Sequence, residues 1–307
     1  MVSRAFENTY LTAKGEPRAK VELSALQTLW LNTGTLCNLS CEHCYIESSP
    51  RNDRLAYLSA QDVEPFLDEI KTRQLGTQMI GITDGEPFIN PSIIEILNLC
   101  LSRGFETLVL SNAFKVLNKH EQSLLDLNQH YPEQFFIRVS LDHYSKDKHE
   151  EERGEGTFEK TMQRLQWLHA NDFQLSVAGR AMLGENLADS QAGYKSLLEY
   201  YAIDLDLEQK LIIFPEMAND KDVPEISTAC WDILGVKPEQ QMCAHERMLV
   251  KHKGATKPVL MPCTLLAYDE QFVMGNTLQE ADKPVYLNHR FCAQFCVLGG
   301  SSCSGVK

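Results

Sequence analysis

Residues 26–45 read LQTLWLNTGTLCNLSCEHCY, an apolar run followed by three closely spaced cysteines. The run at 26–32 has the length and composition of a buried β-strand. Cys37, Cys41 and Cys44 follow it with the spacing C-x3-C-x2-C. Because functional groups collect at the carboxyl ends of the strands in parallel sheets, this stretch predicts a strand that presents three thiols at one edge of a sheet.

The alternation of apolar runs with amphipathic stretches continues to about residue 215. Strands separated by helices indicate βαβ units with right-handed crossovers. We therefore expect an α/β fold in which residues 26–215 form a partial (β/α)6 TIM-like barrel, with Ser59 and Thr157 as helix N-caps and Gly104 as a helix stop. Further strands are expected at 77–83, 106–111, 135–141, 174–179 and 210–214, and helices at 59–75, 91–103, 119–130, 157–171 and 190–200.

Polar side chains stand where these expected strands end, and the shared edge of a parallel sheet should bring them together. They are Asp84 to Pro87 after the second strand, Ser111 and Asn112 after the third, Ser140 and Asp142 after the fourth, and Arg180 after the fifth.

The net charge and the distribution of apolar residues exclude several classes of protein. The 307 residues carry a formal net charge of −13 without a Lys/Arg cluster, so we expect no nucleic-acid partner. No apolar window is long enough for a transmembrane helix, and the first 20 residues lack the apolar core of a signal peptide. We expect a cytoplasmic protein without a membrane partner.

Nine of the ten cysteines fall into two groups, which predicts two metal sites because disulfides are rare in the cytosol. Three lie between 37 and 44, and six lie between 230 and 303. Cys100 stands alone in an apolar run and is predicted to be a small core residue. Residues 1–25 are interpreted as an N-terminal extension and 216–307 as a small cysteine-rich, metal-stapled domain.

The first group has a spacing that suits three irons of a [4Fe–4S] cluster. No fourth cysteine lies nearby, so one iron is left open for an external ligand such as a bidentate amino acid. The alternative is a Cys3His zinc site that includes His43. However, His43 directly precedes Cys44, which is poor geometry for one tetrahedron.

This motif, with Tyr45 after its last cysteine, resembles the signature of the radical S-adenosylmethionine (SAM) superfamily. The stretch Asp84-Gly85-Glu86-Pro87 is similar to the Gly-Gly-Glu-Pro motif that holds the SAM amino group, with Asp84 as the departure. The resemblance implies Glu86 as the acceptor. The alternative reading of this stretch is a plain turn.

Residues 139–158 resemble the branch of this superfamily that carries SPASM or twitch domains. The resemblance implies that Ser140 and Arg153 bind the ribose and carboxylate of SAM, with Arg180 competing for the carboxylate. Alternatives remain open, because Ser140 and Asp142 could cap a loop and Arg153 could be a surface partner. The implied SAM contacts are Tyr45, Gly85, Glu86, Pro87, Ser111, Asn112, Ser140, Asp142, Arg153 and Arg180.

The C-terminal cysteines resemble a twitch or shortened SPASM arrangement, which implies one auxiliary [4Fe–4S] cluster; a structural zinc is the alternative. Such a cluster could accept an electron, bind substrate or relay electrons. Cys230 is expected to pack beside Trp231. The implied ligands are Cys243, Cys263, Cys292 and Cys296, with Cys303 as an alternative.

The resemblance implies an enzyme that cleaves SAM reductively, with Cys37, Cys41 and Cys44 as its catalytic cysteines. The resulting 5′-deoxyadenosyl radical would remove a hydrogen atom from a small molecule or a peptide, and the electron donor would be a protein such as flavodoxin or ferredoxin. About 25 residues precede the first expected strand, fewer than a leader-binding domain would need, so we expect a small molecule or a peptide delivered by a separate partner. The competing interpretations are an iron–sulfur electron-transfer or cluster-carrier protein and a zinc-stapled binding module.

Overall fold

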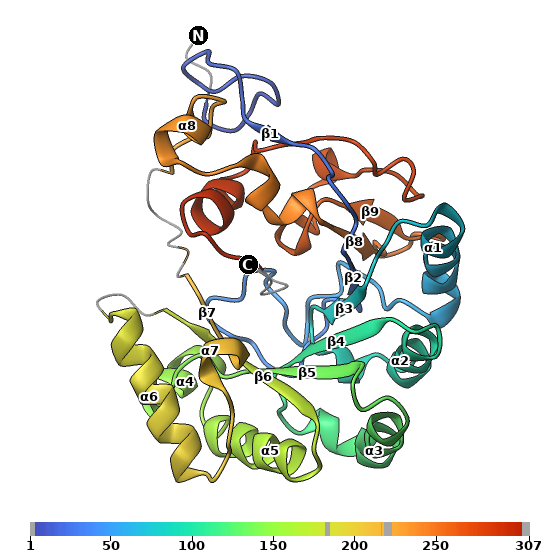
Figure 1. Ribbon diagram of the computed structural model, residues 1–307, viewed down its shortest axis with the longest axis vertical. Coiled ribbons are helices and arrows are strands. Elements are labelled where there is room, and N and C mark those ends of the chain that lie inside the picture. Colours follow the sequence, from blue (N-terminus) through green and yellow to red (C-terminus); the bar gives the residue numbers. More distant parts are fainter. Residues whose placement is uncertain (1–3, 182–184, 216, 218–222, 303–307) are drawn as a thin grey trace.

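The computed structural model describes residues 4–181, 185–215, 217 and 223–302. Its centre is a run of six parallel strands that lie side by side in chain order, as the sequence predicted (Figure 1). They form an open barrel rather than a closed one. The strands are β2 (Thr28–Asn32), β3 (Met79–Thr83), β4 (Glu106–Ser111), β5 (Phe135–Ser140), β6 (Gln174–Arg180) and β7 (Leu211–Phe214).

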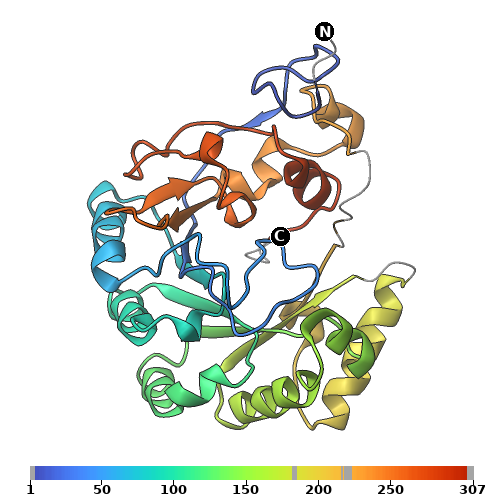
Figure 2. The same cartoon turned by 180° about the vertical axis from the view of Figure 1, so that it is seen from behind.

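Helices cover the outside of this sheet (Figures 1 and 2), and each of the five predicted helices is present. The sequence did not predict α4, because its charged sequence KDKHEEER has no apolar stripe and buries only His149 and Glu152. The helices are α1 (Ala60–Arg73), α2 (Ile93–Ser102), α3 (Glu121–His130), α4 (Lys146–Arg153), α5 (Phe158–Ala170), α6 (Leu187–Tyr200) and α7 (Leu207–Lys210).

Two of the three predicted helix signals are confirmed. Ser59 forms a capping box with Asp62 at the start of α1, and Gly104 follows α2 with a φ of +87°. Thr157 was predicted to cap α5 but makes no capping hydrogen bond. Its hydroxyl donates to the carbonyl of Gly154 instead, at 2.7 Å.

The C-terminal region extends the same sheet, which the sequence analysis did not predict. β8 (Glu246–Val250) lies parallel to β2, and β9 (Val259–Met261) lies antiparallel to β8. The N-terminal strand β1 (Lys20–Val21) pairs with β10 (Val285–Tyr286), so the first residues pack on the C-terminal region. The domain boundary at residue 216 stays a prediction. The remaining short helices are η1 (Pro87–Ile89), η2 (Val116–His120), α8 (Cys230–Leu234), η3 (Pro238–Gln240), η4 (Met242–Ala244), η5 (Thr264–Leu266), η6 (Glu270–Phe272) and the π-helix η7 (Cys292–Val297).

One apolar core runs through the barrel and the C-terminal region. Cys100 is fully buried in it on α2, as predicted for a core residue. Across the described ranges, no helix is both long and apolar enough to cross a membrane.

The capping box predicts a measurable difference between two serines at helix starts. Replacing Ser59 by Ala should lower the free energy of unfolding by about 1 kcal/mol, because the cap satisfies backbone N–H groups of α1. Ser92, the matched control before α2, makes no capping bond through its side chain. Urea unfolding of S59A and S92A checks this; equal losses in the two variants would contradict it.

Candidate functional site

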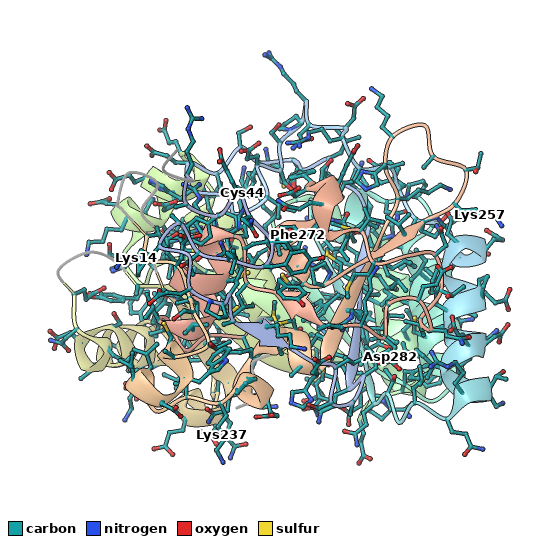
Figure 3. All side chains as sticks on the ribbon, turned by 90° about the horizontal axis from the view of Figure 1, so that it is seen from above. Lys14, Cys44, Lys237, Lys257, Phe272 and Asp282 are labelled. Carbon is teal, nitrogen blue, oxygen red and sulfur yellow. The ribbon has the colours of Figure 1, made fainter. Side chains whose placement is uncertain are left out.

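The main cavity opens at the carboxyl ends of the parallel strands and holds about 1090 Å³ of space, its open mouth included. The predicted strand-end residues do meet there. Those that line it are Cys37, Cys41, Cys44, Tyr45, Gly85, Ser111, Asn112, Ser140, Asp142, Arg153 and Arg180. Figure 3 looks down on the molecule and places Cys44 toward the middle of the view, with Lys237 and Lys257 at its rim.

The cysteine loop offers its sulfurs as hydrogen-bond acceptors. The backbone N–H groups of Leu39 and Ser48 donate to Cys37 Sγ and Cys44 Sγ, at 3.5 and 3.3 Å. The Asn112 amide lies 3.6 Å from Cys37 Sγ. Burial raises the pKa of Cys37 to about 12, whereas a bound metal ion favours the thiolate. N–H donors aimed at sulfur therefore fit cluster-ligating thiolates.

His43 has another partner. Its Nδ1 lies 2.8 Å from a carboxylate oxygen of Glu152 on α4, and the N–H of Glu42 donates to the carbonyl of Glu152. These contacts fasten the cysteine loop to α4. The zinc alternative would require the same imidazole to join the three cysteines.

Glu86 lies behind the cavity wall rather than in it. Its carboxylate accepts from the Ser111 hydroxyl at 2.9 Å, from the Asn112 N–H at 2.8 Å and from the Phe88 N–H at 3.3 Å. Burial raises its pKa to about 7. The carboxylate thereby joins the end of β3 to the end of β4. Pro87 begins η1 and is not among the lining residues. The SAM-binding roles expected for both residues stay predictions.

Asp84 is the acidic side chain of this motif that lines the cavity. It has a φ of +73°, a region that favours glycine, and its carboxyl accepts from the Asn32 amide. Burial raises its pKa to about 8. Gly85 must be glycine, since a Cβ there would lie 2.3 Å from the carbonyl oxygen of Leu36.

Arg153 and Asp142 form a bidentate ion pair at the cavity wall, with distances of 2.7 and 3.1 Å. Burial would raise the pKa of Asp142, but the Arg153 guanidinium outweighs it and holds that pKa below the ordinary value. Only 11% of the Arg153 side chain is exposed, so the alternative that it is a surface partner is wrong.

Arg180 also lines the cavity, and its guanidinium has an N–H group without a hydrogen-bond partner. It is 8% exposed, donates from Nη2 to the carbonyl of His43 at 3.0 Å, and lies over the ring of Tyr45. Its buried Nε has no partner, and no carboxylate of the described residues lies within 4.0 Å of it. A ligand carboxylate in the main cavity would meet this guanidinium unopposed.

A second, smaller cavity of about 300 Å³ lies in the C-terminal region. It is lined by Cys243, Cys263, Cys292 and Cys296, the four cysteines predicted to hold an auxiliary cluster. Cys292 and Cys296 are four residues apart on η7, which puts them on one face of the helix. Four cysteines, the number that ligates a cubane, therefore line one cavity, and their role as its ligands stays a prediction.

Of the other two C-terminal cysteines, only Cys230 belongs to the described residues, and it is not among those that line this cavity. Cys230 begins α8 next to Trp231, and its sulfur lies 3.7 Å from the Ser227 hydroxyl. Cys303 lies outside the described residues.

The two cavities share a wall. Thr264 and Leu265 follow Cys263 directly and line the main cavity, and so does Phe295, which precedes Cys296. The Phe295 ring packs against Tyr45 and Phe214 at centroid distances of 6.0 and 5.6 Å. The sequence analysis missed these wall residues, because only the packing of the C-terminal region brings them there.

Residues 31–192, more than half of the chain, match the Radical SAM superfamily. The antilisterial bacteriocin subtilosin biosynthesis protein AlbA of Bacillus subtilis is 31% identical over 143 residues, which are 46% of this chain and 30% of AlbA. The AdoMet-dependent heme synthase of Methanosarcina barkeri is 24% identical over 142 residues, 46% of this chain and 38% of that protein. The chain therefore matches less than half the length of either relative.

Two solved structures have a similar fold. Streptococcus suis SuiB bound to the precursor peptide SuiA has a TM-score of 0.59 at 14% identity, over 85% of this chain and 66% of SuiB. The protein anSMEcpe with bound AdoMet and Cp18Cys peptide has a TM-score of 0.57 at 14% identity, over 83% of this chain and 80% of that one. The predicted partial barrel is thus confirmed.

The Asp84 carboxyl should make the free energy of unfolding fall as the pH rises. Its folded pKa of about 8 lies above its ordinary value, so folding favours the protonated carboxyl and loses stability between about pH 4 and pH 8. Replacing Asp84 by Asn should remove at least about 1.4 kcal/mol of that loss, the equivalent of one pKa unit.

The measurement is anaerobic urea unfolding at pH 5 and pH 8. Asp53→Asn is the control, because Asp53 is an exposed carboxylate paired with Lys253. An Asp84→Asn protein with the same pH slope as the parent would contradict the raised pKa.

Proposed function

Because the chain belongs to the radical SAM superfamily, as its cysteine spacing predicted, we propose that it cleaves SAM reductively and removes a hydrogen atom from a substrate in the main cavity. The cofactors of this superfamily are a [4Fe–4S] cluster and SAM, as predicted. SPASM-type relatives carry auxiliary clusters, which supports the second predicted cluster. The observation that carries the proposal is the convergence of Cys37, Cys41 and Cys44 with Arg180 on one cavity.

The three cysteines would hold the cluster. When bound, the reduced cluster supplies one electron to the SAM sulfonium, which yields methionine and a 5′-deoxyadenosyl radical. The chain's own part is to orient the ligands and keep water away. The N–H donors of Leu39 and Ser48 support the thiolates, and the apolar Leu265 and Phe295 close the cavity toward the C-terminal region.

We assign the carboxylate of SAM to Arg180 rather than Arg153. The Arg153 guanidinium already gives two hydrogen bonds to Asp142, whereas Arg180 lies in the same cavity without a carboxylate partner among the described residues. A guanidinium with free N–H groups forms strong, charge-assisted bonds to a carboxylate.

The auxiliary cluster would sit behind the shared wall. When bound at Cys243, Cys263, Cys292 and Cys296, it can accept one electron. Thr264, Leu265 and Phe295 line the substrate cavity, and each lies within two residues of a cysteine that lines the second cavity. This adjacency supports a net oxidation of the substrate.

We propose a peptide as the substrate class. The names of AlbA, SuiB and anSMEcpe point to a bacteriocin, a precursor peptide and a bound peptide. A small molecule is the second candidate, in line with the heme synthase of Methanosarcina barkeri. The electron donor would be a protein such as flavodoxin or ferredoxin, in a reducing compartment such as the cytoplasm.

Replacing the three cysteines of the barrel should remove the SAM-binding cluster and leave the auxiliary cluster in place. After anaerobic reconstitution the parent should hold about eight irons per chain, two cubanes, and release 5′-deoxyadenosine from SAM under dithionite. The triple variant Cys37→Ala, Cys41→Ala, Cys44→Ala should keep about four irons and release none. Cys230→Ser is the control and should match the parent. A parent that binds iron but never cleaves SAM would instead indicate a carrier protein.

Arg180 should matter only for ligands that carry a carboxylate. Replacing Arg180 by Gln should raise the Kd for SAM at least tenfold, about 1.4 kcal/mol, because a charge-assisted bond is lost. Decarboxylated SAM, which lacks the group, should bind parent and variant alike. Equilibrium dialysis with both ligands checks this; an equal loss for both would assign Arg180 a structural role.

A further inference from the structure

Arg247 is a buried cation outside the main cavity. It lies on β8, its side chain is 0% exposed, and all its hydrogen bonds go to backbone carbonyls. Nε donates to Ala281 at 3.0 Å, Nη1 to Cys243 at 2.6 Å and to Glu246 at 2.7 Å, and Nη2 to Lys283 at 3.2 Å. These acceptors are dipoles and carry no net charge.

Two other buried arginines of the described residues have carboxylate partners. Arg18 pairs with Glu225, and Arg153 pairs with Asp142. Among the described residues no carboxylate lies within 4.0 Å of Arg247. The nearby Asp282, labelled in Figure 3, turns a side chain that is 55% exposed toward Arg73. A buried charge without a counter-charge is costly, so its presence calls for an anionic partner.

Two of the three acidic groups that act on the pKa of Arg247 are cysteines of the second cavity. Burial lowers the pKa of Arg247, and Cys243, Asp282 and Cys263 counteract it in that order. The arginine in turn lowers the pKa of Cys243, although burial still raises that pKa to about 11. Nη1 holds the carbonyl of Cys243 itself. Through this bond the guanidinium lies next to one of the four cysteines that line this cavity.

We propose that Arg247 is the counter-charge of the auxiliary cluster and raises its reduction potential. The inference rests on the auxiliary cluster of the proposed function. A cluster held by four thiolates is anionic and gains one further negative charge when it accepts an electron. A buried positive charge nearby stabilises that reduced state more than the oxidised one. Arg247 is thus a positioning residue that makes the cluster a better acceptor for a substrate electron.

The test is a redox titration of the auxiliary cluster followed by electron paramagnetic resonance. The full chain with Cys37, Cys41 and Cys44 replaced by Ala isolates this cluster. In that background Arg247→Gln should make the midpoint potential more negative by about 59 mV, a tenfold change in the ratio of oxidised to reduced cluster for one electron. Arg247→Lys keeps the charge and should shift it by less than half as much.

The control is Arg164→Gln, which breaks a distant ion pair with Glu121 on the outside of the barrel and should leave the potential unchanged. If R247Q loads iron and titrates at the parent potential, the inference is overturned while the proposed function stands. If the triple-cysteine background holds no iron at all, the auxiliary cluster itself is refuted.

If R247Q does not fold or does not bind iron, the Arg247→His variant tests the same idea, because pH then changes the charge at position 247 in a single protein. Its midpoint should fall between pH 6 and pH 9 more steeply than that of the parent, because the imidazole loses its proton over this range. A pH dependence equal to that of the parent would overturn the inference.

Discussion

The parallel pairing of β2 with β8 is the constraint on which the rest of the structure depends. It runs from Thr28 opposite Glu246 to Leu31 opposite Leu249, and the buried Trp30 indole donates to Glu246 at 2.5 Å. β2 leads into the cysteine loop, while β8 follows Cys243 and carries Arg247. A strand pair that joins residues more than 200 positions apart therefore brings two sets of cysteines to neighbouring cavities.

The distribution of buried charge follows the same arrangement. Arg153 is neutralised by Asp142 and so stiffens the wall of the main cavity. Arg180 and Arg247 have no carboxylate partner among the described residues, and each adjoins one of the two cavities. An isolated buried cation destabilises a folded protein, and an anionic group in the neighbouring cavity would offset that cost at both positions. Binding of such groups would then stabilise the fold as well as serve chemistry.

The sequence predicted the parallel sheet and most of the cavity, because apolar runs mark the strands and parallel strands end at one edge. It could not predict α4, whose charged sequence has no apolar stripe, or the wall residues Thr264, Leu265 and Phe295, which depend on the β2–β8 pairing. The sequence could not distinguish the surroundings of the two acidic side chains in the Asp84–Glu86 motif, and the SAM-binding role expected for Glu86 stays a prediction. Asp84 lines the cavity, and Glu86 braces the strand ends behind it.

The backbone of Asp84 explains why this difference matters. An L-residue in the left-handed region costs roughly 1 kcal/mol that glycine would not, so the side chain must compensate by its contacts. The Asn32 amide provides one contact, and the cavity leaves the rest of the carboxyl for a ligand. With a pKa near 8 the empty site holds a proton there, and an arriving ammonium group would displace it. Asp84 and Arg180 thus place an acidic and a basic side chain on the lining of one cavity.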